Sequence, residues 1–312
     1  MKSLKFFALG LALTFGAAAN AQPPADVLKL IESTYDPAIS VESNFGELSI
    51  AGCWKKEITL TTKDPVTLSP RKVRLKQYAP LFNRHPENLK TVLVMPPTGG
   101  ENILDQLYSN ALCRAGFRAV MVQGWDDDTF TELDAKMHDR GALKALAAIR
   151  QAVEYAVGGR SDVKVGILGT SVGAISSSFA AGFDSRISTA VLIVGGIGMP
   201  EIIGASTEKT LTRLRAERSQ AFGYKSVEEY QAALAKTLVV EPGDFIGHSG
   251  PKKVFMVLAT QDVTVPTKNQ WDLYRAFGNQ ELRTFEGNHI EAIKASPKLY
   301  LQDMIAFLQQ NL

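Results

Sequence analysis

The chain has 312 residues, of which 45% are hydrophobic and 21% are charged, with 34 Lys and Arg against 32 Asp and Glu. This is the balance of a globular protein with enough apolar material for one large core or two smaller ones. A net charge so close to zero argues against a protein that binds nucleic acid or an anionic membrane. After the N-terminus, no stretch is apolar for long enough to span a bilayer.

The first 21 residues have the pattern of a secretory signal peptide. Lys2 and Lys5 precede a short apolar run, and Ala19-Asn20-Ala21 is a small-x-small cleavage site before Gln22. Removing the two lysines leaves 32 basic residues (34 − 2) against 32 acidic ones. We expect a periplasmic or secreted mature chain that starts at about Gln22 and keeps no membrane anchor. An uncleaved anchor helix is the alternative.

Residues from about 45 to 80 predict an antiparallel β-hairpin region. The segments "ELSIAG", "KEITLTT" and "VRLKQYAP" alternate polar and apolar residues, as strands with one solvated face do. The chain has two cysteines, Cys53 in this region and Cys113 further on. Their spacing fits no zinc site. Export makes a Cys53–Cys113 disulfide possible, and two unlinked buried thiols are the alternative.

From Val92 onward, short apolar runs alternate with helical patterns. The predicted strands are Thr91 to Pro97, Arg118 to Trp125, Val163 to Gly169, Ser188 to Gly196, Lys252 to Thr260 and the segment "ELRTFEG". Most of these runs are apolar throughout, as expected for strands covered on both faces. The alternation predicts an α/β fold, in which a mostly parallel sheet has helices on both faces. We expect one such domain over residues 22–312.

Helical patterns fill the segments between the strands. Leu143, Leu146, Ile149 and Val153 form one stripe, and the glycines that follow end that helix. Ser296 followed by a proline predicts the start of the last helix. About fifty residues, 200–250, separate two strands and contain two helical patterns, the second beginning with a capping box of Ser226 and Glu229. They predict a helical cap inserted over one edge of the sheet.

The segment "VKVGILGTSVGAISSSF" places Ser171 between Gly169 and Gly173, where a strand must turn into a helix. Such a turn needs small neighbours, and it lifts the serine hydroxyl clear of the sheet beside a helix N-terminus. This is the G-x-S-x-G pattern of a nucleophile elbow. A glycine-rich turn with a capping serine is the alternative. The glycines fit neither phosphate-binding pattern.

A serine nucleophile needs a base, and the base needs a carboxylate. Of the four histidines, His289 follows the last predicted strand, at the edge where parallel sheets place active residues. We expect the other three, His85, His138 and His248, to be solvated. Asp262 follows the fifth strand and is the predicted acid, with Glu286 as the second choice.

Two N–H groups are needed to stabilise an oxyanion. Val172, directly after the serine, provides one. The segment "VMPPTGG" provides the other from the backbone of Thr98, Gly99 or Gly100.

These four segments, "GTSVG", "PPTGG", "ATQDVTVP" and "EGNH", resemble those of α/β-hydrolases from about Thr91 to Leu312. The surroundings of Asp262 are similar to those in the dienelactone-hydrolase and esterase branch and in some prolyl-peptidase-like members. The resemblance implies a serine hydrolase that forms an acyl-enzyme and uses no metal or organic cofactor. The "PPTGG" loop departs from the His-Gly of many lipases and esterases, which leaves the identity of the second oxyanion donor open.

We therefore expect hydrolysis of a small-molecule carboxylic ester by Ser171, His289 and Asp262. A peptidase or amidase, an acyltransferase and a catalytically silent binding module are the alternatives. The segment "GWDDDTF" follows the second core strand, and Trp125 in it is a candidate pocket residue. A solvated acidic loop is the other interpretation of this segment.

Overall fold

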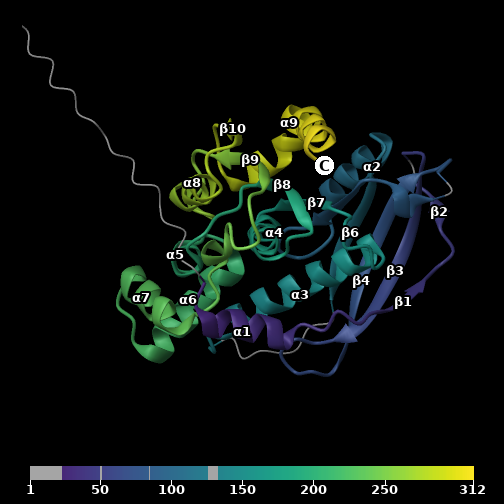
Figure 1. Ribbon diagram of the computed structural model, residues 1–312. Coiled ribbons are helices and arrows are strands. Elements are labelled where there is room, and N and C mark those ends of the chain that lie inside the picture. The colour runs from purple at the N-terminus through teal and green to yellow at the C-terminus, as the bar shows by residue number, and fades with distance from the viewer. Residues whose placement is uncertain (1–22, 50, 84, 126–132) are drawn as a thin grey trace, which may run out of the picture.

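A computed structural model describes residues 23–49, 51–83, 85–125 and 133–312. In this part of the chain, helices cover both faces of one ten-stranded sheet (Figure 1). The strands are β1 Ser40–Ser43, β2 Glu47–Leu48, β3 Cys53–Lys63, β4 Pro70–Pro80, β5 Thr91–Met95, β6 Arg118–Trp125, β7 Val165–Thr170, β8 Ile187–Ile193, β9 Lys253–Ala259 and β10 Glu281–Phe285. The α-helices are α1 Ala25–Thr34, α2 Ile103–Arg114, α3 Met137–Val157, α4 Val172–Phe183, α5 Met199–Ala205, α6 Lys209–Phe222, α7 Val227–Thr237, α8 Thr267–Ala276 and α9 His289–Asn311. Two short 3₁₀ helices are η1 Pro86–Asn88 and η2 Pro242–Phe245.

The sheet has a parallel and an antiparallel half. Its order is β1-β3-β4-β6-β5-β7-β8-β9-β10, with β2 also paired to β3. The six strands from β6 to β10 are parallel, and β4 joins them antiparallel at β6. All six core strands expected from the sequence are present. The predicted α/β fold, with a mostly parallel sheet and helices on both faces, is confirmed.

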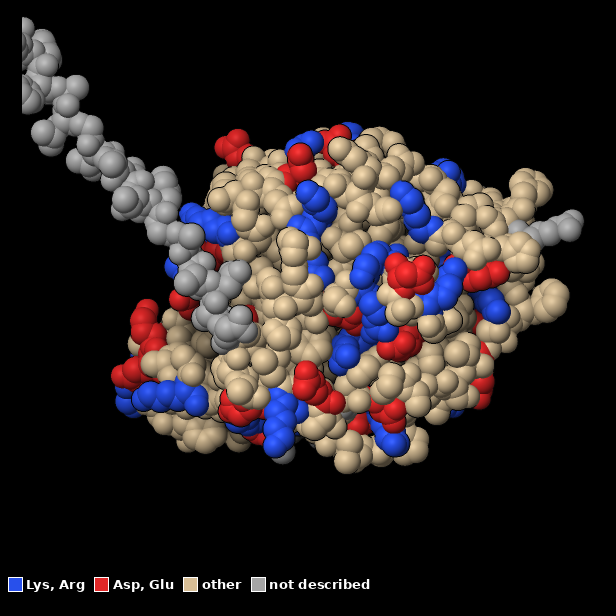
Figure 2. Space-filling model, viewed as in Figure 1, with Lys and Arg blue, Asp and Glu red and all other residues tan. Residues whose placement is uncertain are grey.

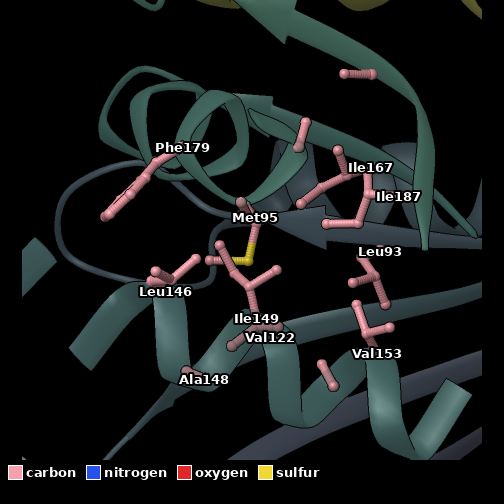
Figure 3. Packing of buried hydrophobic residues seen from close by; sticks show 14 of the residues in the cluster. Leu93, Met95, Val122, Leu146, Ala148, Ile149, Val153, Ile167, Phe179 and Ile187 are labelled. Atoms are coloured by element: carbon pink, nitrogen blue, oxygen red, sulfur yellow. The ribbon is translucent and has the colours of Figure 1, made fainter. Parts of the chain in front are cut away.

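The central strands carry apolar residues on both sides because both faces of the sheet are buried. In β5, Leu93 and Met95 pack toward α3 and α4 (Figure 3), whereas Val92 and Val94 face the cluster that includes α2 and α9. A strand buried in this way has no solvent-facing position, so its sequence is a continuous apolar run.

The strands of the N-terminal region pair antiparallel and extend the sheet. β3 and β4 form a long antiparallel pair, and β1 and β2 add to the other side of β3. The structure joins Cys53 at the start of β3 to Cys113 near the end of α2 by a disulfide, with the Cα atoms 6.4 Å apart. The sequence left open whether these cysteines are bridged or unlinked, and in the structure they are bridged.

Two helices differ from the sequence-based expectation. The first, α1, was not anticipated, and it buries Val27 and Ile31 against the cluster that contains α3. The last helix, α9, begins eight residues before the predicted Pro297 and runs through it. The prediction was wrong because Asn288 and Glu291 form a capping box that satisfies the N-terminal amides of the helix.

Residues 199–245 form the inserted helices, which we call the cap: α5, α6, α7 and η2. Its small core joins Ile203, Tyr230 and Leu234. The side chain of Ser226 accepts the N–H of Glu229 as predicted, but the Glu229 carboxylate returns to Lys225 rather than to Ser226. In Figure 1 the cap helices α6 and α7 lie at one end of the molecule, away from the N-terminal strands.

The surface carries charges of both signs. On the face shown in Figure 2, Lys and Arg side chains are interspersed with Asp and Glu. Among the described residues, none of the helices combines the length and the apolar character needed to span a membrane.

Candidate active site

Ser171 lies in the sharp turn between β7 and α4. Its backbone has φ +56° and ψ −121°, a conformation that a non-glycine residue rarely adopts. The two glycines of the motif are required by close packing. A Cβ on Gly169 would lie less than 3.0 Å from the carbonyl oxygen of Gly173. A Cβ on Gly173 would lie equally close to the carbonyl oxygens of Met95 and Pro96. The turn therefore fits only with glycines on both sides of the serine.

His289 reaches Ser171 from the start of α9, just after β10. The distance between His289 Nε2 and Ser171 Oγ is 2.8 Å, and both residues are buried. The two lie 118 positions apart in the sequence and meet because β7 and β10 end at the same edge of the parallel sheet.

Asp262 completes a chain of hydrogen bonds. It follows β9, and its Oδ2 lies 2.5 Å from His289 Nδ1. The N–H groups of Thr264 and Val265 donate to Oδ1 at 2.8 and 3.0 Å. Glu286, the second choice for this position, is exposed. The structure therefore places Asp262, and not Glu286, against the histidine.

This arrangement fixes the tautomer of the histidine. A carboxylate only accepts hydrogen bonds, so the proton of neutral His289 lies on Nδ1. The lone pair of Nε2 then points to the hydroxyl of Ser171 and is able to take its proton. The three side chains are hydrogen-bonded in the order serine, histidine and carboxylate, which is the arrangement that serine hydrolases use.

The backbone hydrogen bonds reduce the number of N–H groups that could bind an oxyanion. Val172 is the first residue of α4, and the first N–H groups of a helix have no partner within it. Pro96 and Pro97 have no N–H, and the N–H of Gly100 donates to the carbonyl of Pro97 at 3.2 Å. Gly100 therefore does not supply the second donor. Thr98 and Gly99, both exposed, remain as the candidates.

A cavity of about 610 Å³ opens beside the serine. Its wall includes Val172 and Gly173 directly after Ser171, and it extends from the 96–100 loop to the N-terminal half of α3. Small residues on α3, namely Gly141, Ala142 and Ala145, leave this space open. Trp125 ends β6, but its side chain and residues 126–132 lie outside the described part of the chain.

The other histidines divide into two groups. His85 and His248 are exposed, as expected. His138 is half-buried, lines the cavity and lies 3.0 Å from Arg218, so its prediction as a solvated surface residue was wrong. The polar sequence around it belongs to the first turn of α3, which the cap covers.

No family model and no curated protein matches the sequence. Solved structures do match its fold. The acetyl xylan esterase from Paenibacillus sp. R4 has a TM-score of 0.63 at 15% identity, covering 92% of this chain and 93% of its own. The acetyl xylan esterase 1 from Thermoanaerobacterium sp. JW/SL YS485 has a TM-score of 0.64 at 14% identity, covering 92% and 95%. This chain has the α/β-hydrolase fold.

A third α/β-hydrolase structure is similar over nearly the same length. It is a cold-adapted esterase from an Arctic intertidal metagenomic library, with a TM-score of 0.54, 16% identity, and 86% of this chain and 97% of its own covered. At these identities the similarity concerns the fold, so the roles of individual residues rest on the geometry described above.

The sequence-based prediction did not include Gln270, which contacts Asp262 in this fold. Gln270 in α8 is fully buried, and its Nε2 donates to Asp262 Oδ2 at 2.7 Å. The same amide group is held by the backbone of Ala259 and Val265. The available signal was a glutamine on the same helical stripe as Leu273 and Phe277, where an apolar residue is expected.

Proposed function

We propose that this protein is an exported serine hydrolase that cleaves carboxylic esters through an acyl-enzyme on Ser171. The observation that carries the proposal is the continuous hydrogen-bonded chain from Ser171 Oγ through His289 to Asp262, with its 2.8 and 2.5 Å distances. The strained backbone of Ser171 supports it, because strain at a non-glycine residue is characteristic of functional sites.

The geometry supports a two-step reaction. As Ser171 Oγ attacks the ester carbonyl, His289 Nε2 takes the hydroxyl proton, and Asp262 stabilises the imidazolium that forms. The N–H of Val172 and one N–H of the 98–99 segment bind the oxyanion. His289 then gives its proton to the departing alcohol, which leaves an acyl-Ser171 ester. Water, activated by the same His289 nitrogen, hydrolyses that ester and frees the serine.

Ester hydrolysis is favoured over the amidase, acyltransferase and binding-module alternatives. The three similar structures described above are named as esterases, two of them acetyl xylan esterases. The bridge between Cys53 and Cys113 supports export, since disulfides persist mainly in oxidising compartments. The signal pattern over residues 1–21 agrees with this location.

Labelling and turnover with one set of variants test the proposal. A fluorophosphonate probe should label the wild-type protein and not Ser171→Ala. A panel of 4-nitrophenyl and acetylated-sugar esters should be hydrolysed by the wild type and not by Ser171→Ala. Ser185→Ala, at an exposed position just after α4, is the matched control that keeps its label and its turnover. If Ser171→Ala retains more than a few percent of wild-type turnover, Ser171 is not the nucleophile. Labelling without ester turnover would favour an amidase or an acyltransferase, and neither labelling nor turnover would favour a binding module.

A further inference from the structure

His138 occupies a defined place in the cavity wall. It lies in the first turn of α3 and lines the cavity. The distance between its Nε2 atom and Arg218 Nη1 is 3.0 Å. The next residue, Asp139, anchors this turn, because its carboxylate accepts the N–H groups of Val239 and Val240 from the segment after α7. The imidazole is therefore held between the cavity and the cap.

The contact with Arg218 fixes the tautomer of His138. A guanidinium group has only N–H donors, so Nε2 of His138 must be the acceptor and carries no proton. The proton of the neutral imidazole then lies on Nδ1. Arg218 is itself firmly placed: its side chain is 1% exposed, and it donates to the Tyr230 hydroxyl at 2.7 Å. Burial, followed by the charge of Arg218, lowers the pKa of His138 to about 4, which keeps the ring neutral at pH 7.

The Nδ1–H group of His138 is left available. In the part of the chain that the structure describes, no acceptor lies within hydrogen-bond distance of Nδ1. A donor at a partly buried position needs an acceptor, because a polar group that loses its water without one destabilises the site. The cavity that His138 lines is the space from which such an acceptor can approach.

Resting on the proposed esterase function, we propose that His138 Nδ1–H donates a hydrogen bond to an oxygen of the substrate portion that fills this cavity. Esters with an ether, hydroxyl or carbonyl oxygen at that point are then preferred over esters with a methylene there. Arg218 is the positioning residue, since it acts through His138 and belongs to the cap. The cap thereby contributes to substrate selection through one hydrogen bond.

Paired substrates isolate this hydrogen bond. In each pair, a 4-nitrophenyl methoxyalkanoate and the alkanoate of equal chain length differ only by an oxygen in place of a CH₂ group. We expect the wild type to favour the ether ester at one chain length by roughly fivefold to tenfold in kcat/KM, the value of one neutral hydrogen bond. His138→Phe should abolish this ratio. His138→Asn should retain most of it, because the amide nitrogen of asparagine takes the place of Nδ1.

The exposed His85→Gln is the matched control and should leave the ratio and the activity unchanged. If the ratio is the same in the wild type and in His138→Phe at every chain length, the inference is wrong. The same holds if His138→Asn loses the ratio as completely as His138→Phe.

A second measurement needs no turnover. ¹⁵N NMR of the wild-type imidazole, assigned by its absence in His138→Asn, should show a protonated Nδ1 and an unprotonated Nε2 at pH 7, and Arg218→Met should lose this pattern. Adding the unreactive N-methyl amide of the preferred methoxy acid should shift the Nδ1–H signal, whereas the alkyl amide should not. A protonated Nε2 in the wild type, or equal responses to both amides, would overturn the inference. Failure of the wild type to hydrolyse any ester would instead count against the proposed function, and the NMR result would still decide the role of His138.

Discussion

Replacing Asp262 by asparagine removes one charge while keeping the shape of the side chain, and the surrounding contacts dictate how the amide must sit. The N–H groups of Thr264 and Val265 both donate to Oδ1. The amide oxygen must therefore take the Oδ1 position, since an NH₂ group there would face two donors. This places the NH₂ group at the Oδ2 position, 2.5 Å from His289 Nδ1 in the wild type.

Gln270 cannot relieve the resulting conflict. Its Nε2 donates to Asp262 Oδ2 and to the Val265 carbonyl, and its Oε1 accepts the N–H of Ala259, so a flip of the amide would break two bonds to the backbone. Two donors then face each other in a buried site, which we expect to lower the free energy of unfolding by about 1–3 kcal/mol.

The larger effect is on catalysis. The new NH₂ group donates to His289 Nδ1, which forces the imidazole proton onto Nε2, where it points at the Ser171 hydroxyl. The base is then blocked, and we expect kcat to fall about ten-thousand-fold, equivalent to about 5.5 kcal/mol in activation free energy. Steady-state hydrolysis of a 4-nitrophenyl ester measures this loss, with circular dichroism to show that the variant is folded.

Glu286→Gln is the control for this prediction, because Glu286 is exposed and should affect turnover less than about tenfold. A folded Asp262→Asn protein with more than a tenth of wild-type kcat would refute the tautomer argument. The reverse ranking of the two variants would assign the role to Glu286.

Three further perturbations test other parts of the structure. Gly173→Ala places a Cβ against the carbonyl oxygens of Met95 and Pro96, so ester turnover should drop at least a hundredfold. A near-normal kcat would show that the turn adjusts to the added methyl group. Replacing Cys53 and Cys113 by alanine opens a 60-residue loop and should lower the free energy of unfolding by about 4 kcal/mol in urea titrations; two free thiols in unreduced, denatured wild-type protein would contradict the bridge. The pKa of His138 is lowered from 6.5 to about 4 in the folded protein. Between these pH values the unfolded chain therefore binds more protons than the folded one. The free energy of unfolding should fall by up to about 3 kcal/mol from pH 7 to pH 4. His138→Gln should remove this loss of stability. If the variant loses as much free energy of unfolding as the wild type between pH 7 and pH 4, His138 is not a buried neutral ring.

Local sequence determined the parts of this protein that depend on neighbouring residues. The continuous apolar strands, the G-x-S-x-G turn at Ser171 and the stripe of α3 could all be identified, because burial on both faces of a sheet and a tight strand-to-helix turn each limit the residue types within a few positions. Ser171, Asp262 and His289 could be chosen from the sequence because each follows a strand, and parallel strands end at one edge of a sheet.

Tertiary structure alone decided which of the remaining polar residues matter. Gln270 supports Asp262, Arg218 meets His138 from the cap, and the amide of Gly100 is taken by its own loop. His138 and Arg218 are 80 positions apart, and no periodicity or motif connects them. A side-chain hydrogen bond depends on where two backbones come to lie after packing, and it leaves no pattern in the sequence when its partners belong to different elements. For the same reason the sequence assigned His138 to the solvent, whereas packing of the cap against α3 made it part of the cavity wall.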